Sequence, residues 1–332
     1  MSLKKKKILH IDITIESKEK ILEYIRKYLV NGSKYTIQSS KVSKKTLVIA
    51  TPNSEQIVAS VRDKYFAKLL NQADIAIPDG IGIVWASRIL RQTPLSGRIS
   101  GIDLMNDLVV MASKERVPMG LIGGRGGVAV RALECLQEKH PGLIGWAVDG
   151  PKVNIKYQIS NIKYSNQKSK RIHSQQYNNI AIESSFAQAA SFAEVATEAE
   201  SEGKPASPAD RQSRQDVTDE YIREVVERIR NTGTRIVFVG LGAPKQEYFI
   251  ERLRDAVVRW SSSHPAIQPV VFMSVGGAFD VLSGAIPRAP EPIRLLGFEW
   301  LWRLLRQPWR VSRQLALPRF ILLVLKSRYL HP

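Results

Sequence analysis

One aspartate stands where a parallel sheet would place a catalytic group. Asp79 lies between Pro78 and Gly80, directly after the short apolar segment Asp74–Ile77. A carboxylate held on a tight turn at the end of a buried strand can accept a proton from a hydroxyl group, as a general base does. An Asp-Gly turn also forms for structural reasons, because Asp bonds its own backbone and Gly permits positive φ. Spacing alone therefore leaves both roles open for Asp79.

Two glycine-rich turns are typical of phosphate binding. Gly123-Gly124-Arg125-Gly126-Gly127 and Gly240-Leu241-Gly242 each separate an apolar segment from an expected helix. Backbone N–H groups in such turns, with the N-terminus of the following helix, can cradle a pyrophosphate. Neither turn is a complete G-x-G-x-x-G with an acidic residue for a ribose, and neither is a Walker A loop. The turns favour a diphosphate ligand without the dinucleotide signature.

Polar residues adjoin these turns. Lys245-Gln246-Glu247 follows Pro244, so we expect these side chains in the first turn of a helix, facing the cleft. Lys245 is suited to neutralise a phosphate, and a solvated surface position suits it equally. Arg98 and Asp103 flank Gly101, and the guanidinium of Arg98 is well suited to clamp a diphosphate.

The sequence lacks the usual motif for binding a nucleotide-bound magnesium ion. It contains no Asp-x-Asp pair, which is the usual carboxylate site for that cation. The single cysteine, Cys135, excludes an intramolecular disulfide and a cysteine-based zinc site, and we expect it to be a core residue. The histidines lack ligand spacing, so none receives a role: His10, His140, His173, His264 and His331. We therefore expect no metal and no cofactor.

Alternating apolar and amphipathic segments predict the frame that positions these residues. We expect strands at 8–13, 46–50, 74–77, 119–122, 143–148, 235–239 and 270–275, and helices at 17–29, 55–71 (with Ser54 as N-cap), 128–139, 218–231 and from 245. Continuous apolar strands separated by helices predict an α/β fold, a Rossmann-like parallel sheet with helices on both faces. Right-handed crossovers bring the C-terminal strand ends to one edge, where ligands bind. That edge is the predicted site.

The pattern fails between residues 151 and 217. Residues 152–180 are rich in Lys, Asn, Gln, Ser and Tyr without periodicity, and 203–208 contain helix breakers. We interpret 151–217 as a largely disordered insertion in a core that spans residues 1–287. We expect residues 288–332 to form a basic amphipathic helical appendage.

The charge is strongly positive and unevenly placed. The chain has 332 residues and a formal net charge of +18. Residues 1–45, 288–332 and 152–175 carry net charges of +8, +7 and +6, so the remainder is slightly acidic. Such patches suit either nucleic-acid phosphates or anionic lipid headgroups. No uncharged apolar run approaches the ~18 residues of a membrane span, and we expect a cytoplasmic protein.

The last segment resembles an interfacial helix. Leucines and tryptophans alternate there with arginines, and Arg303, Arg306, Arg310 and Arg313 form one helical stripe if Pro308 only kinks the helix. Short Arg/Trp/Leu helices are typical of membrane-surface segments. The alternative is a basic helix that packs on the protein's own core.

Six motifs follow one another along the chain outside the insertion. They are Thr51-Pro52-Asn53, Ala76-Ile77-Pro78-Asp79-Gly80-Ile81-Gly82, Gly240-Leu241-Gly242-Ala243-Pro244-Lys245-Gln246-Glu247, Gly276-Gly277-Ala278-Phe279-Asp280, Arg288-Ala289-Pro290 and Leu296-Gly297-Phe298-Glu299-Trp300-Leu301-Trp302-Arg303-Leu304. Together they resemble the WecG/TagA/CpsF glycosyltransferases, glycosyltransferase family 26, from about residue 8 to residue 329. Ordered motifs of this length are highly specific.

This resemblance implies an inverting, metal-independent transfer of a sugar from a UDP-sugar to a polyprenyl-diphosphate-linked acceptor, at the inner face of the plasma membrane. It implies Asp79 as the general base. The residues expected to bind substrate are Thr51, Asn53, Gly80, Arg98, Gly123, Gly124, Gly240, Gly242, Lys245, Gln246, Glu247, Gly276, Gly277 and Asp280. The appendage is expected to bind an anionic membrane and to meet the acceptor through Arg288, Arg294, Arg303, Arg306, Arg310 and Arg313.

Some features depart from the family or stay open. Arg125 and Gly126 stand where the family usually has a lysine and a proline or glutamate, so phosphate contacts there are in doubt, and the insertion is foreign to the pattern. N-acetylmannosamine, its uronic acid, glucose and galactose all fit as the sugar, and teichoic-acid, common-antigen and exopolysaccharide pathways as the product. We expect no nucleic-acid partner, and a homo-oligomer stays open. The rival functions are a dinucleotide-dependent oxidoreductase and a non-catalytic basic membrane- or nucleic-acid-binding module.

Overall fold

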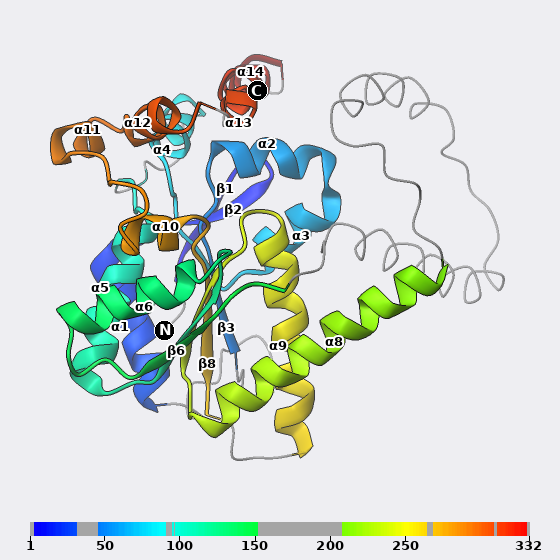
Figure 1. Ribbon diagram of the computed structural model, residues 1–332. Coiled ribbons are helices and arrows are strands. Elements are labelled where there is room, and N and C mark those ends of the chain that lie inside the picture. The colour runs from blue at the N-terminus through cyan, green and yellow to red at the C-terminus, as the bar shows by residue number, and fades with distance from the viewer. Residues whose placement is uncertain are drawn as a thin grey trace. The chain divides into compact units, whose positions relative to one another are not determined.

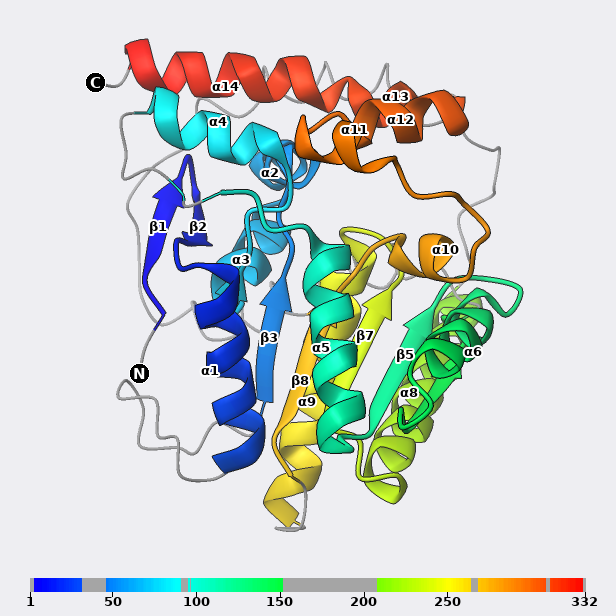
Figure 2. The same ribbon diagram turned by 90° about the vertical axis from the view of Figure 1, so that its left-hand side faces the viewer.

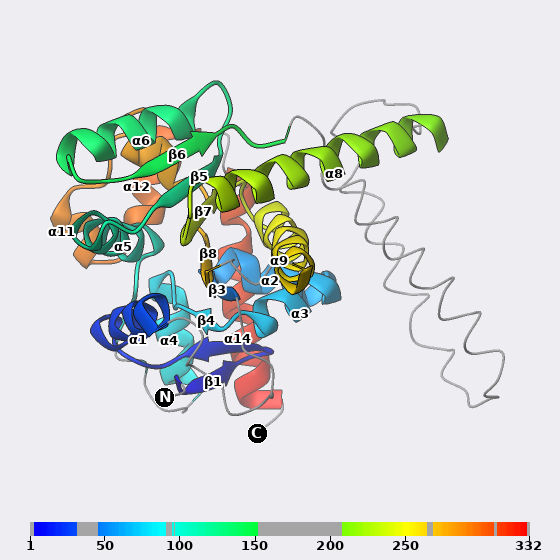
Figure 3. The same ribbon diagram turned by 90° about the horizontal axis from the view of Figure 1, so that it is seen from below.

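Six parallel strands form the central sheet of the computed structural model, which describes residues 3–31, 46–90, 95, 97–151, 208–263, 268–308 and 311–330. Their order is β4-β3-β8-β7-β5-β6 (Figure 3), and Figure 1 shows the sheet with helices on either side. The strands are β3 (Thr46–Ala50), β4 (Ile75–Ala76), β5 (Met119–Gly123), β6 (Gly145–Val148), β7 (Ile236–Gly240) and β8 (Val270–Ser274). β5 and β8 are buried along their whole length, as the continuous apolar runs predict.

Helices cover both faces of this sheet (Figure 3). One face carries α1 (Lys18–Asn31), α5 (Gly101–Glu115) and α6 (Val128–Lys139), whose apolar sides join the strands in one core cluster. The other face carries α3 (Lys64–Gln72), α9 (Lys245–Ser263) and the C-terminal part of α8 (Pro208–Asn231). The predicted α/β class is confirmed. All six strands point their C-terminal ends to the same edge.

The sequence predicted a strand of this sheet at residues 8–13, but the N-terminal segment lies outside the sheet. The chain instead folds into an antiparallel hairpin of β1 (Lys5–Ile8) and β2 (Ile11–Thr14), reversing at Leu9, whose φ is 58°. Ile8, Ile11 and Ile13 are fully buried, so the apolar pattern is used, but across two short strands.

The predicted helix over 55–71 is two helices. Asp63 ends α2 (Ser54–Arg62) in an extended conformation, and its carboxylate accepts hydrogen bonds from two N–H groups in the first turn of α3. Asn53 rather than Ser54 caps α2, because its Oδ1 accepts from the Gln56 N–H at 2.9 Å. Both details of the prediction were wrong, since two capping residues lie inside one amphipathic run.

The structure adds helices that the sequence analysis did not assign. α4 (Ile81–Ile89) starts directly after the Pro78-Asp79-Gly80 turn, and α10 (Ala278–Leu282) follows β8. Residues 152–207 lie outside the described ranges, so the expected disorder of the insertion stays a prediction. α8 begins at Pro208, well before the predicted residue 218. By contact, Lys152–Glu220 form a unit apart from the one that contains the sheet.

The appendage consists of short helices that belong to the same compact unit as the sheet. They are α11 (Glu291–Leu295), α12 (Glu299–Arg306), α13 (Val311–Gln314) and α14 (Ala316–Leu330). α14 packs on α2 and α4, where Phe320 and Val324 are fully buried (Figure 2). None of the helices in the described ranges is long and apolar enough to cross a membrane.

Candidate active site

A cavity of about 520 Å³ lies at the C-terminal edge of the sheet. The turns after β3, β4, β5, β7 and β8 form its floor, and residues of the appendage, which lies above the strand ends in Figure 2, line its other side. The predicted site residues that line it are Thr51, Asn53, Asp79, Gly80, Arg98, Gly124, Gly240, Gly242, Gln246, Gly276, Gly277, Asp280, Arg303 and Arg313. The structure therefore brings together residues from both ends of the chain.

Asp79 sits at the floor of this cavity on a constrained turn. Its N–H donates to the Pro52 carbonyl at 3.0 Å, and Gly80 follows with a φ of 135° that only glycine adopts without strain. The Gly101 N–H, at the start of α5, donates to the Asp79 carboxylate. A Cβ on Gly101 would lie 3.3 Å from Asp79 Oδ2, so glycine allows this close approach.

The surroundings of Asp79 favour its neutral form more than water does. Burial raises the pKa of the Asp79 carboxyl to about 6, and the Glu299 charge adds to this rise. The Arg98 charge and the Gly101 hydrogen bond act in the opposite direction. A carboxylate with this pKa is ionised at neutral pH and still a stronger base than an ordinary aspartate, which is what general base catalysis requires.

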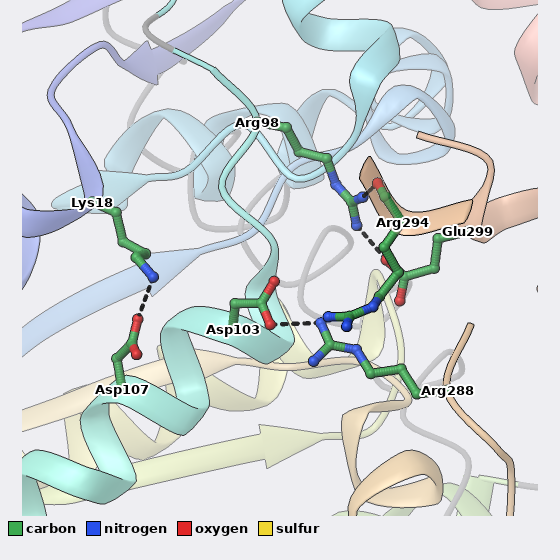
Figure 4. A network of polar contacts seen from close by, with 7 residues as sticks. All are labelled: Lys18, Arg98, Asp103, Asp107, Arg288, Arg294 and Glu299. Atoms are coloured by element: carbon green, nitrogen blue, oxygen red, sulfur yellow. Dashed lines mark hydrogen bonds and ion pairs between the residues drawn. The ribbon is translucent and has the colours of Figure 1, made fainter. Parts of the chain in front are cut away.

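Arg98 is held by the appendage (Figure 4). Its Nη2 pairs with the Glu299 carboxylate of α12, and its Nη1 donates to the Arg294 carbonyl at 3.4 Å. Below this pair, Arg288 Nη2 donates to Asp103 Oδ1 at 2.6 Å. Arg98 lines the cavity as predicted, but Arg288 and Arg294 do not. Those two link the appendage to the core.

The glycine turns pack backbone against backbone. Gly123 has a φ of 137°, and a Cβ there would lie 2.5 Å from the Gly240 carbonyl oxygen. This approach aligns the turns after β5 and β7, so that Gly124 and Gly240 line the same wall. Gly123 itself does not line the cavity, and its predicted contact with substrate is not supported by its position.

The Lys245-Gln246-Glu247 segment contributes one side chain to the cavity instead of three. Gln246 is fully buried; its Oε1 accepts from the Gly276 N–H at 3.0 Å, and its Nε2 donates to Glu247 Oε1 at 2.9 Å. Glu247 lies behind Gln246 and, like Lys245, does not line the cavity. Burial raises the pKa of the Glu247 carboxyl to about 7. The prediction that all three face the cleft was wrong because α9 turns two of them away.

The predicted arginine stripe is not a single helical face. α12 ends at Arg306 and the chain turns at Gln307, so the helix does not continue past Pro308 as the prediction required. Arg303 donates to the Gly277 carbonyl at 3.3 Å, and Arg313 lies 3.8 Å from the Glu55 carboxylate. Both line the cavity, whereas Arg306 is exposed and stacks over Trp302. Arg310 and Trp309 lie outside the described residues.

Glu299 is a site residue that was not predicted from the sequence. It was part of a family motif, but no local pattern indicates that it meets Arg98, 201 residues away. Trp300 and Gln56 also line the cavity and were missed. In the described part of the chain, no group of three or more His, Cys, Asp and Glu side chains is arranged to hold a metal ion.

Comparison with known proteins identifies the family of this chain. The sequence pattern of the glycosyl transferase WecG/TagA/CpsF family matches residues 7–169 and 200–331. The chain belongs to this family. It is therefore a glycosyltransferase, and the oxidoreductase and the non-catalytic binding module are set aside.

One relative of this glycosyltransferase carries a specific name. It is 28% identical over 283 residues, which cover 84% of this chain and 79% of the relative. The relative is the N-acetylglucosaminyldiphosphoundecaprenol N-acetyl-beta-D-mannosaminyltransferase of Bacillus subtilis strain 168. The name of that protein specifies a lipid-linked diphosphate as its acceptor and N-acetylmannosaminyl as the group that it transfers.

Proposed function

We propose that this glycosyltransferase moves an N-acetylmannosamine-type sugar from a UDP-sugar to a polyprenyl-diphosphate-linked acceptor in cell-envelope polysaccharide or teichoic-acid synthesis. The observation that carries the proposal is the cavity with Asp79 on its floor and Arg303 and Arg313 at its appendage side. Its volume of about 520 Å³ lies within the usual range for small-molecule sites. The name of the Bacillus relative supports the choice of sugar and acceptor.

In the proposed reaction Asp79 removes the proton of an acceptor hydroxyl. The hydroxyl oxygen then forms a bond to the anomeric carbon as the bond from that carbon to the UDP oxygen breaks. Attack from the face opposite UDP inverts the anomeric configuration, and the proton stays on Asp79 until it passes to solvent. One base and one displacement suffice, so no covalent intermediate with the enzyme is needed.

The leaving diphosphate gains negative charge, which fixed cationic and N–H groups stabilise without rearranging. Arg303 and Arg313 supply positive charge at the cavity, and the turn Gly240-Leu241-Gly242, which lines it, supplies backbone N–H groups. In this proposal these groups take the role that a divalent metal ion has in many other nucleotide-sugar enzymes.

We further propose that the enzyme works peripherally on the inner face of the plasma membrane. Large apolar side chains are exposed on α4 and on the appendage, which lie together in Figure 2: Ile81, Trp85, Leu296, Phe298, Leu301, Leu305, Val311, Leu315, Ile321 and Leu322. Exposed Arg306, Arg319 and Lys326 accompany them. Apolar and basic groups together are what an interfacial segment needs to bind anionic lipid.

The proposal is tested by incubating the enzyme with a panel of UDP-sugars and a synthetic N-acetylglucosaminyl-diphosphate lipid, with and without excess EDTA. We expect one glycosylated lipid product by mass spectrometry, an inverted anomer by NMR, and equal rates in EDTA. Transfer to no lipid acceptor, or a retained configuration, would overturn the proposed reaction. Loss of rate in EDTA that Mg²⁺ or Mn²⁺ restores would overturn metal independence alone.

A further inference from the structure

Arg98 lies close to two carboxylates. It pairs with Glu299, and the N–H of its neighbour Ile99 donates to the carbonyl of Pro78, next to Asp79, at 3.1 Å. Both terminal nitrogens of its guanidinium are engaged by the appendage, one with Glu299 and one with the Arg294 carbonyl (Figure 4). Asp79 accepts its hydrogen bond from Gly101, and in the described part of the chain no hydrogen bond joins Asp79 to Arg98. Arg98 acts on Asp79 only through its charge.

We propose that Glu299 is a positioning residue of the transfer reaction: by holding Arg98 it prevents a direct Arg98–Asp79 ion pair and leaves the Asp79 carboxylate available as the base. This inference rests on the proposed function, in which Asp79 is that base. Glu299 belongs to α12, so the base is competent only while the appendage is seated on the core.

The competition follows from the chemistry of arginine. A guanidinium forms charge-assisted hydrogen bonds to a carboxylate, and such a pair lowers the pKa of the acid by about 1 to 3. A carboxylate with a lowered pKa is a weaker base, and its lone pairs are occupied. Removing the Glu299 charge frees Arg98 and also removes a negative neighbour of Asp79. Both changes weaken the base.

The other charged group that faces Asp79 stays in place when Glu299 is changed. Asp103, on α5, also contributes to the charge around Asp79 and is itself paired with Arg288 at 2.6 Å. This pair does not involve Glu299. A change in the acidity of Asp79 after substitution of Glu299 is therefore due to Glu299 and Arg98.

The test is the pH dependence of kcat/KM in Glu299→Gln, an isosteric change that removes only the charge. We expect the acidic limb to move to lower pH by about one pH unit and the plateau rate to fall about 10-fold. Glu299→Asp keeps the charge and should keep the acidic limb of the wild type. The matched control is Glu291→Gln, an exposed glutamate in the first turn of α11, which should change neither quantity.

A double-mutant cycle shows whether Glu299 acts through Arg98. In an Arg98→Ala background, Glu299→Gln should lower kcat much less than the 10-fold expected in the wild type, because Arg98 is gone and only the lost negative neighbour of Asp79 still acts. Thermal melting with UDP confirms that each variant is folded. Fully additive effects would mean that Glu299 acts by another route, and would overturn the inference.

Three further results would overturn it. They are an unchanged profile in Glu299→Gln, an equal loss in the Glu291→Gln control, and a lower rate in Glu299→Gln without movement of the acidic limb. The failure of the proposed function gives a different result. If Asp79→Asn keeps its activity, Asp79 is not the base, and this inference falls with that assignment.

Discussion

At Asp79 two conditions of a general base meet in one side chain. Burial raises the pKa of the carboxyl, and within the described residues it accepts a hydrogen bond from the Gly101 N–H and none from Arg98. We expect Asp79→Asn to lower transfer by at least ~10²-fold while UDP affinity stays nearly unchanged, because the amide keeps the shape but accepts no proton. Single-turnover kinetics and UDP titration measure the two quantities. Near-normal turnover would show that another residue is the base.

The acidity of Asp79 also predicts the pH profile of the wild-type enzyme. Its pKa is raised to about 6, chiefly by burial, and the base works only when ionised. We expect kcat/KM to fall about tenfold per pH unit below pH 6 and to level off above it. A profile that is flat between pH 5 and 7 would contradict this assignment.

The buried carboxyl group of Glu247 should lower the stability of the fold at high pH, where it must ionise. Burial raises its pKa from the ordinary 4.5 to about 7, so the fold favours the neutral acid. Stability from this group is therefore lost as pH rises from about 4.5 to 7. We expect Glu247→Gln to increase the free energy of unfolding by about 3 kcal/mol at pH 8 and by almost nothing at pH 4.

The control for this prediction is Glu138→Gln on α6, which is exposed. Chemical unfolding at both pH values should show no difference between this control and the wild type. If Glu247→Gln is destabilised at pH 8, the ionised carboxylate stabilises the fold by accepting the hydrogen bond from Gln246.

Single residues were predictable where they adjoin the end of a strand. Thr51, Asp79 and Gly240 each follow an apolar run, and parallel strands bring such positions to one edge. Glu299 was not predictable in this way, because its partner Arg98 is distant in sequence and only the fold joins them. Lys245 and Glu247 were placed wrongly, because the sequence does not fix the rotation of α9 about its own axis.

At the scale of elements, the turn after β5 depends on a backbone contact. Gly123 combines a φ of 137° with a Cβ position 2.5 Å from the Gly240 carbonyl oxygen. We expect Gly123→Ala to lower the free energy of unfolding by more than about 3 kcal/mol, because β5 and β7 must separate. Urea unfolding of the variant measures this loss.

Gly126 is the matched control in the same turn. It has a φ of 65°, but nothing lies within 4 Å of its Cβ position. Gly126→Ala should cost only the strain of the left-handed backbone, about 1 kcal/mol. Equal losses in both variants would show that strain, and not the contact with Gly240, governs the turn.

Buried parallel strands were the most predictable elements, because their apolar runs are continuous. Each of β3, β5, β7 and β8 was predicted within one residue at either end. The hairpin of β1 and β2 was not, since one apolar run serves equally for one strand or for two short ones. The division of α2 from α3 at Asp63 depends on a cap that amphipathic spacing does not reveal.

At the scale of the whole molecule, core and appendage meet through arginine–carboxylate pairs. Besides Arg98 with Glu299 and Arg288 with Asp103, Arg303 lies 3.7 Å from Asp280. The residues of two of these pairs, Arg98–Glu299 and Arg303–Asp280, line the cavity, so the contact of the appendage with the core also shapes the site. Substitution of cavity arginines would therefore change catalysis and membrane binding together. A test of membrane binding needs residues outside the cavity.

Leu305 and Leu322 meet that need, since they are 72% and 66% exposed and do not line the cavity. We expect Leu305→Ser with Leu322→Ser to weaken binding to anionic vesicles by about 2 kcal/mol, roughly 30-fold, because two apolar side chains no longer enter the interface. Activity on a long-chain lipid acceptor in vesicles should fall with binding, whereas activity on a short-chain soluble acceptor should not.

The control is Val30→Ser on α1, equally exposed but remote from the appendage. Raising the salt should weaken the contribution of Arg306, Arg319 and Lys326 and leave the leucine effect intact. Vesicle co-sedimentation equal to that of the wild type would mean that the appendage serves only to close the cavity.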